Sequence, residues 1–144
     1  MSQLRDFQSN LPMALLKARE SVMGRFRPIL RAHDITEQQW RVIRALHGHE
    51  GMEVTALAQK CMILMPSLTR ILKTLEAQDF VKRFSVQGDN RRALIRLAAK
   101  GRELHSKIAP LSEAEYKRLE SAIGSEKLSQ LYELLGAIAD TDNA

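Results

Sequence analysis

Apolar residues recur at helical spacing at both ends of the chain. Residues 11–32 carry a stripe made up of Leu11, Leu15, Ala18, Val22 and either Phe26 or Ile29. This spacing predicts a long amphipathic helix. A second helix is expected over roughly 99–121, where Pro110 would bend it or Ser112 and Glu115 would restart it. A last helix, capped by Ser125, would present a stripe of Leu128, Leu131, Leu135 and Ile138.

The stretch "DITEQQWRVIRAL" contains the signals of a helix start. Thr36 is placed as the N-cap and Gln39 completes a capping box, while Ile35 and Trp40 occupy the two hydrophobic-staple positions. A helix is therefore expected to begin at Glu37 and to end at Gly48 and Gly51. The following "VTALAQKC" predicts a short helix capped by Thr55, and its inward residues would be Leu57, Ala58 and Cys61.

The stretch "ILMPSLTRILKTLEAQDF" predicts a helix over 66–78 with two different faces. Pro66 suits the first helical turn, where its missing N–H costs nothing. At 100° per residue the apolar side chains Leu68, Ile71, Leu72 and Leu75 point one way, and the opposite face carries Pro66, Ser67, Arg70, Lys73 and Thr74. After this helix the pattern alternates in "FVKRFSV" and "ALIRL" around the turn formers "QGDNR". Residues 80–97 therefore read as a β-hairpin.

Composition and charge narrow the class of protein. The 144 residues are 44% hydrophobic and 27% charged, which fits one ordinary globular domain. We find no signal peptide and no apolar stretch long enough to span a bilayer, and a single Cys61 fits a reducing compartment, so the protein is expected to be cytoplasmic. Residues 53–97 hold eight Lys and Arg against four acids, whereas residues 111–144 hold three against seven. The positive charge is therefore concentrated in residues 53–97, as expected if this region binds a polyanion.

This order of elements is that of a winged helix-turn-helix: a mainly α fold with a small β-hairpin wing at 35–98, flanked by dimerisation helices at 1–34 and 99–144. The helix over 66–78 would enter the major groove of double-stranded DNA, and the hairpin tip would reach a minor groove or a phosphate. A winged helix that binds another protein is the alternative, but that role requires an apolar or acidic outward face. The helix face and the hairpin tip predict Ser67, Arg70, Lys73 and Arg91 as DNA contacts. Together with what the family resemblance described next implies, the predicted set is Pro66, Ser67, Thr69, Arg70, Lys73, Asp89, Arg91 and Arg92.

The segments "ITEQQWRVIRAL", "VTALAQKC", "PSLTRILKTLEAQDFVKR" and "GDNRRALIRLAAKG" resemble successive blocks of the MarR family of dimeric transcriptional regulators. Within it, the chain looks like the homoprotocatechuate-degradation operon regulators. The resemblance implies major-groove contacts by Pro66, Ser67 and Arg70. It also implies that Asp89 orients a wing arginine while Arg91 enters the minor groove. One departure is Ala98, where the family usually has a capping Thr.

The resemblance further implies a small aromatic carboxylate effector such as 4-hydroxyphenylacetate or 3,4-dihydroxyphenylacetate. The residues expected to bind it are Arg19, Met23, Trp40, Arg41 and Leu64. A planar guanidinium suits a carboxylate, although each arginine could instead be solvated or ion-paired. The predicted function is a homodimeric repressor that binds a pseudopalindromic operator of an aromatic-acid catabolic operon.

Other chemistry finds little support in the sequence. The spacing of His33, His47, His49 and His105 does not favour a metal site, and no cofactor is expected. The sequence contains no specific combination of a nucleophile, a general base and a residue that orients the base, so we do not expect an enzyme. Redox sensing by Cys61 is a second alternative, but its inward position predicts an inert thiol.

Overall fold

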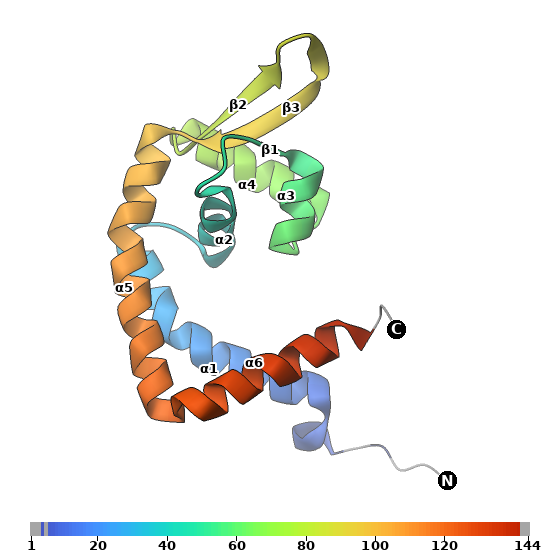
Figure 1. Ribbon diagram of the computed structural model, residues 1–144, viewed down its shortest axis with the longest axis vertical. Helices are drawn as coiled ribbons and strands as arrows, with labels where there is room; N and C mark the ends of the chain where they lie inside the picture. The colour runs from blue at the N-terminus through green and yellow to red at the C-terminus, as the bar shows by residue number, and fades with distance from the viewer. Residues whose placement is uncertain (1–3, 5, 142–144) are drawn as a thin grey trace. The chain divides into compact units, whose positions relative to one another are not determined.

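The computed structural model describes residues 4 and 6–141, which belong to two compact units. One unit contains Arg27–Pro110, and the other contains the described residues of Met1–Phe26 and Leu111–Ala144. The two longest described helices, α1 (Leu11–Ala32) and α5 (Ala99–Ile123), are labelled in Figure 1, and each contributes residues to both units. None of the described helices is long and apolar enough to cross a membrane.

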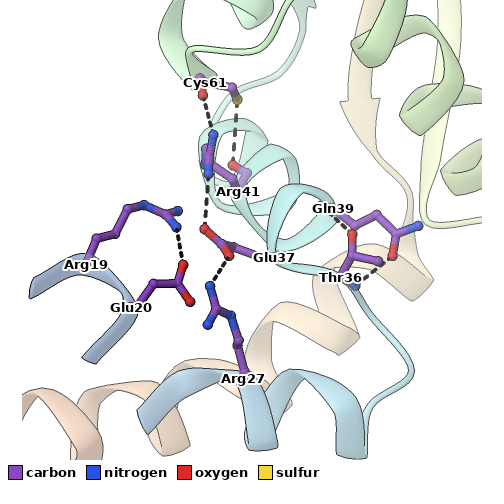
Figure 2. Close-up of polar contacts among 8 residues, drawn as sticks. All are labelled: Arg19, Glu20, Arg27, Thr36, Glu37, Gln39, Arg41 and Cys61. Carbon is purple, nitrogen blue, oxygen red and sulfur yellow. Dashed lines mark hydrogen bonds and ion pairs between the residues drawn. The ribbon is translucent and has the colours of Figure 1, made fainter. Parts of the chain in front are cut away.

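Helix α2 (Glu37–Leu46) begins at the residue that the sequence predicts, because both halves of the capping box form. The Thr36 hydroxyl accepts a hydrogen bond from the Gln39 backbone N–H at 3.1 Å, and the Gln39 side chain accepts one from the Thr36 N–H at 2.9 Å (Figure 2). Ile35 and Trp40, the predicted staple residues, are both buried. The cap and the staple thus fix where α2 starts.

Helices α3 (Val54–Cys61) and α4 (Met65–Ala77) complete the helix-turn-helix core. Their inward side chains are almost fully buried: Leu57, Cys61, Leu68, Leu72 and Leu75. The predicted Thr55 cap is wrong, because the N-cap residue of α3 is Glu53 and Thr55 lies inside the helix.

The reason lies in a short strand before α3. Strand β1 (Met52–Glu53) pairs antiparallel with β3 (Asp89–Leu97), and this pairing holds the backbone extended through Glu53, so the helix starts directly after it. Strand β2 (Val81–Val86) pairs with the other edge of β3, giving the sheet order β1-β3-β2. The predicted hairpin is confirmed, whereas β1 was not foreseen.

The inner face of the sheet carries Val81, Ile95 and Leu97, which are buried against the helical core. Helix α5 begins at Ala99 although Ala98 provides no capping hydroxyl. The backbone N–H of Ala98 instead donates to Phe80 O at 2.9 Å, which links the end of β3 to the start of β2. The Arg27–Pro110 unit is therefore a winged helix-turn-helix.

The other unit holds the 3-10 turn Phe7–Ser9, the N-terminal part of α1, the C-terminal part of α5, and α6 (Ser125–Ala139). Phe26 on α1 contacts Tyr116 on α5 with ring centroids 4.8 Å apart. Many of its apolar side chains are exposed within the single chain: Leu4, Phe7, Leu11, Leu131, Leu135 and Ile138. A partner subunit would cover these exposed side chains.

The helix expected over roughly 99–121 is confirmed as α5, whereas the alternative of a restart at Ser112 and the expected Ser125 cap are wrong. Helix α5 continues through Pro110, and Ser112 is buried inside it instead of restarting it. Ser125 is the first residue of α6 and not its cap, since Gly124, at φ 100°, occupies the cap position without a side-chain hydrogen bond.

Candidate DNA interface and effector site

The two faces of α4 separate as the sequence predicts. Leu68, Leu72 and Leu75 are completely buried, while Arg70 and Lys73 are exposed on the opposite side. Within residues 4 and 6–141, neither cation has a carboxylate oxygen within 4.0 Å. Both charges are therefore available to an external anion.

Threonine hydroxyls on α4 are already engaged with its backbone. Thr69 Oγ1 donates to Met65 O at 2.9 Å, and Thr74 Oγ1 donates to Arg70 O at 3.2 Å. A hydroxyl has one proton, so Thr69 can offer DNA its oxygen lone pairs and its methyl group but no donor while this bond lasts. Thr69 is thus suited to a thymine methyl or a donor group.

The wing tip is ordered through Asp89. Its Oδ1 accepts a hydrogen bond from the backbone N–H of Arg91 at 3.0 Å, in a turn where Gly88 has φ 92°. The Asp89 carboxylate thus holds the Arg91 backbone, and the Arg91 side chain is exposed. The contact of Asp89 is thus with the Arg91 main chain, and its role in orienting a wing arginine for DNA stays a prediction.

Arg92 is bound within the protein. Its Nη2 and Nε lie 2.7 and 2.8 Å from Glu53 Oε1, so β3 is tied to the N-cap residue of α3. At the other side of the wing, Arg83 Nε donates to Glu76 Oε1 at 3.1 Å and ties β2 to α4. Glu53 could not be predicted as a wing contact from local patterns, because it lies 39 positions from Arg92 in the chain.

Helix α2 carries a second polar cluster, shown in Figure 2, in which Arg41 joins α2 to the end of α3. Arg41 Nη1 donates to Cys61 O at 3.0 Å, and its Nη2 lies 3.3 Å from Glu37 Oε1. Glu37 Oε2 lies 3.5 Å from Arg27. Two of the chain's arginines therefore share one carboxylate.

Trp40, His105 and His47 form a stack of three rings between α2 and α5. The centroids of Trp40 and His105 are 5.4 Å apart, and those of His105 and His47 are 3.6 Å apart with the rings 7° from parallel. Burial lowers the pKa of His105, and electrostatic interactions with His47 and Arg44 lower it further. The stack thus favours a neutral His105.

The predicted effector residues are divided between the units. Trp40, Arg41 and Leu64 belong to the helix-turn-helix unit, where Trp40 is buried and Leu64 is 79% exposed. Arg19 and Met23 belong to the other unit, where Arg19 lies 4.0 Å from Glu20. That these five residues form one pocket stays a prediction.

Cys61 is buried and is not part of a disulfide. Burial raises the pKa of its thiol more than the charges of Arg41 and Lys60 lower it. Its Sγ donates to Arg41 O at 3.8 Å. The neutral thiol form is the unreactive one. Within the described part of the chain, no group of three His, Cys, Asp or Glu side chains could hold a metal ion.

Comparison with known proteins decides the family. The model of the MarR family matches residues 35–93, which cover α2, α3, α4 and most of the wing. The homoprotocatechuate degradative operon repressor of Escherichia coli is 40% identical over 126 residues, which are 88% of this chain and 85% of the relative. The chain belongs to the MarR family.

Other MarR-type relatives agree with this assignment along nearly the whole chain. The HTH-type transcriptional regulator FarR of Neisseria gonorrhoeae is 37% identical over 136 residues, covering 94% of this chain and 93% of the relative. The structure of NadR in complex with 4-hydroxyphenylacetate is 36% identical, with a TM-score of 0.82 and coverage of 93% and 98%. The repressor CouR bound to a 23-mer DNA duplex is 26% identical, with a TM-score of 0.84 and coverage of 96% and 99%. These relatives are transcriptional regulators and not enzymes.

Proposed function

We propose that this protein is a homodimeric, ligand-responsive repressor that acts in the cytoplasm on a pseudopalindromic operator of an aromatic-acid catabolic operon. Each protomer would place α4 in a major groove and the wing tip beside it, so the half-sites should lie about one helical turn apart. The effector would be a small aromatic carboxylate, either 4-hydroxyphenylacetate or 3,4-dihydroxyphenylacetate. The relatives that repress homoprotocatechuate degradation and bind 4-hydroxyphenylacetate support this choice.

The observation that carries the DNA-binding part is the outward face of α4. Arg70 and Lys73 are exposed without an ion-pair partner among the described residues, on a helix whose other face is fixed by three buried leucines. Arginine pairs with guanine through two parallel hydrogen bonds, and lysine suits phosphate as a point charge. We therefore assign base recognition to Arg70 and phosphate binding to Lys73.

The test compares promoter DNA with a scrambled duplex of the same length at two salt concentrations. A repressor should keep a preference for the promoter sequence at both, while its overall affinity falls as salt rises. Sedimentation of the same preparation measures its oligomeric state. Equal affinity for the two duplexes would rule out operator recognition.

The contacts of Arg41 would connect the proposed effector site to the DNA-binding helix. Its guanidinium holds Cys61 O at the C-terminus of α3, four residues before α4 begins at Met65. An effector carboxylate that took the place of Glu37 would compete for this same guanidinium. Binding would then alter the support of α4. A differential affinity of about 1.4 kcal/mol between the two states lowers operator occupancy tenfold.

The effector test uses the single tryptophan of the chain, which is Trp40. Its fluorescence should change saturably with 4-hydroxyphenylacetate or 3,4-dihydroxyphenylacetate, and the operator should be released over the same concentration range. Arg41→Gln and Arg19→Gln should lose the response, whereas Arg31→Gln, an exposed arginine in the last turn of α1, should keep it. If neither compound changes fluorescence or operator binding, the proposed effector class is wrong.

The two alternative functions fit the structure less well. A protein-binding winged helix would present an apolar or acidic face on α4, and this face is cationic. Redox sensing would need a thiolate, and the buried Cys61 has a raised pKa.

A further inference from the structure

A groove lies beside the outer face of the sheet, within the Arg27–Pro110 unit. The loop from Gly48 to Gly51 forms one wall, strands β2 and β3 form the floor, and the start of α5 forms the other wall. Its volume of about 850 Å³ is within the range of small-molecule sites, roughly 300–1,000 Å³. No predicted DNA contact and no predicted effector residue lines it.

The floor of the groove is aromatic and apolar. Phe84 and Leu94 are cross-strand partners and are both half-buried. The loop approaches the ring so closely that a Cβ at Gly51 would lie 2.7 Å from Phe84 Cζ. Glycine at this position therefore lets the loop wall lie directly against the Phe84 ring.

Three cations surround this floor. Lys82 and Arg96 are directly opposite each other on β2 and β3, and Arg102 reaches the groove from α5. Like charges at directly opposed positions destabilise a sheet. Among the described residues none of the three has a carboxylate oxygen within 4.0 Å, and the lining contains a single acid, Glu50. Arg102 Nη1 donates to Leu97 O at 3.0 Å, which leaves its other N–H donors for an anion. The arrangement suits an anion that would offset this repulsion.

We propose that this groove binds a small aromatic compound carrying two or more negative charges. The ring would pack on Phe84 and Leu94, and the anionic groups would pair with Lys82, Arg96 and Arg102. Arg96 lies over Phe84, with its guanidinium carbon 5.0 Å from the ring centroid, so the ligand ring would take the place of this guanidinium on Phe84 and leave its donors to pair with the anionic groups. Aromatic dicarboxylates and nucleoside phosphates share this chemistry. The site is separate from the proposed effector site and does not depend on it.

The experiment titrates the full-length, ¹⁵N-labelled protein with four probes and follows the backbone amides of Gly51, Phe84 and Arg96. Naphthalene-2,6-dicarboxylate represents the aromatic dicarboxylates, and adenosine monophosphate represents the nucleoside phosphates. The probe that binds more tightly shows which of these two classes the groove prefers. Inorganic phosphate and neutral 2-naphthylmethanol are the controls for charge alone and ring alone. We expect saturable changes in these amide chemical shifts with an aromatic dianion, and a lower dissociation constant for it than for either control. Absence of such shifts, or equally tight binding of phosphate, overturns the proposal.

Matched variants locate the site. Arg96→Gln should weaken the aromatic dianion about tenfold to a hundredfold, as expected for loss of a hydrogen-bonded charge, while the exposed side chain leaves the fold intact. The control is Lys100→Gln, which removes a nearby cation that does not line the groove and lies over Phe80 instead. It should bind the dianion as the wild type does. Equal weakening by both variants would show a general charge effect and overturn the site.

The rival occupant of a cationic groove in this fold is the DNA backbone. Arg96→Gln should leave operator affinity without ligand, and its salt dependence, unchanged within about twofold. If the variant instead flattens the slope of log K against log salt by about one unit, Arg96 contacts a phosphate, and the groove belongs to the DNA interface.

Discussion

Arg41 offers the sharpest test of how α2 supports the helix-turn-helix. Arg41→Met keeps most of the aliphatic stem and removes the hydrogen bond to Cys61 O and the ion pair with Glu37. A hydrogen bond from a charged donor contributes about 1.5–3 kcal/mol, and the lower end applies because the Arg41 side chain is 35% exposed. The ion pair adds only about 0.5 kcal/mol, since it is partly solvated and Glu37 keeps its contact with Arg27.

The expected loss in the free energy of unfolding is therefore about 2 kcal/mol, or a fall in Tm of roughly 6 °C for a chain of this size. The measurement is urea unfolding at one fixed protomer concentration, because the stability of a dimer depends on concentration. The m value should stay constant, which shows that the native state and not the denatured state has changed.

Arg44→Met is the matched control for this measurement. Arg44 lies on the same helix and is exposed, and within the described residues it makes no ion pair or side-chain hydrogen bond. Its replacement should change the free energy of unfolding by less than about 0.5 kcal/mol. If Arg41→Met also changes the free energy of unfolding by less than this amount, the contacts of Arg41 do not stabilise the fold. The proposed route from effector to α4 would then lose its physical basis.

The remaining predictions concern DNA, pH and assembly. Arg70→Ala should relax base preference at one position of each half-site at a cost of about 1–3 kcal/mol, whereas Lys73→Ala should weaken all sequences evenly. Site selection that finds unchanged preference in Arg70→Ala would refute the assignment. Arg91→Ala should flatten the salt slope by about one unit and leave the circular dichroism spectrum unchanged, and an unfolded variant would make Arg91 structural. Because burial lowers the pKa of His105 from 6.5, the stability it contributes is present above about pH 6.5 and is lost as pH falls toward the lower folded pKa. Unfolding measured from pH 7.5 to 5 should show less pH dependence in His105→Gln, and an unaltered profile would contradict this. Leu135→Glu should yield monomers in sedimentation, because Leu135 is 38% exposed in the single chain, and a persistent dimer would place the interface elsewhere.

Local signals predicted this fold well where the interacting groups are close in sequence. Thr36 and Gln39 are three residues apart, so their reciprocal hydrogen bonds could be predicted from spacing alone. The same reasoning predicted the wrong cap at Thr55, because the pairing of β1 with residues 94 and 95 decides where α3 begins. The predicted cap at Ser125 was wrong because the adjacent Gly124 occupies the cap position with a positive φ. Capping residues thus predict a helix start only where no neighbouring constraint sets it first.

The candidate site shows the same division between local and distant effects. Periodicity was enough to place Arg70 and Lys73 outward, since the buried leucines of α4 fix the opposite face. It could not distinguish Arg91 from Arg92 in the wing. Arg92 is held by Glu53 from a distant part of the chain, whereas the Arg91 side chain is exposed next to a backbone that Asp89 holds in place. A phosphate would have to displace the Glu53 carboxylate before it could bind Arg92, so the two adjacent arginines should differ in their contribution to DNA affinity although they carry equal charge.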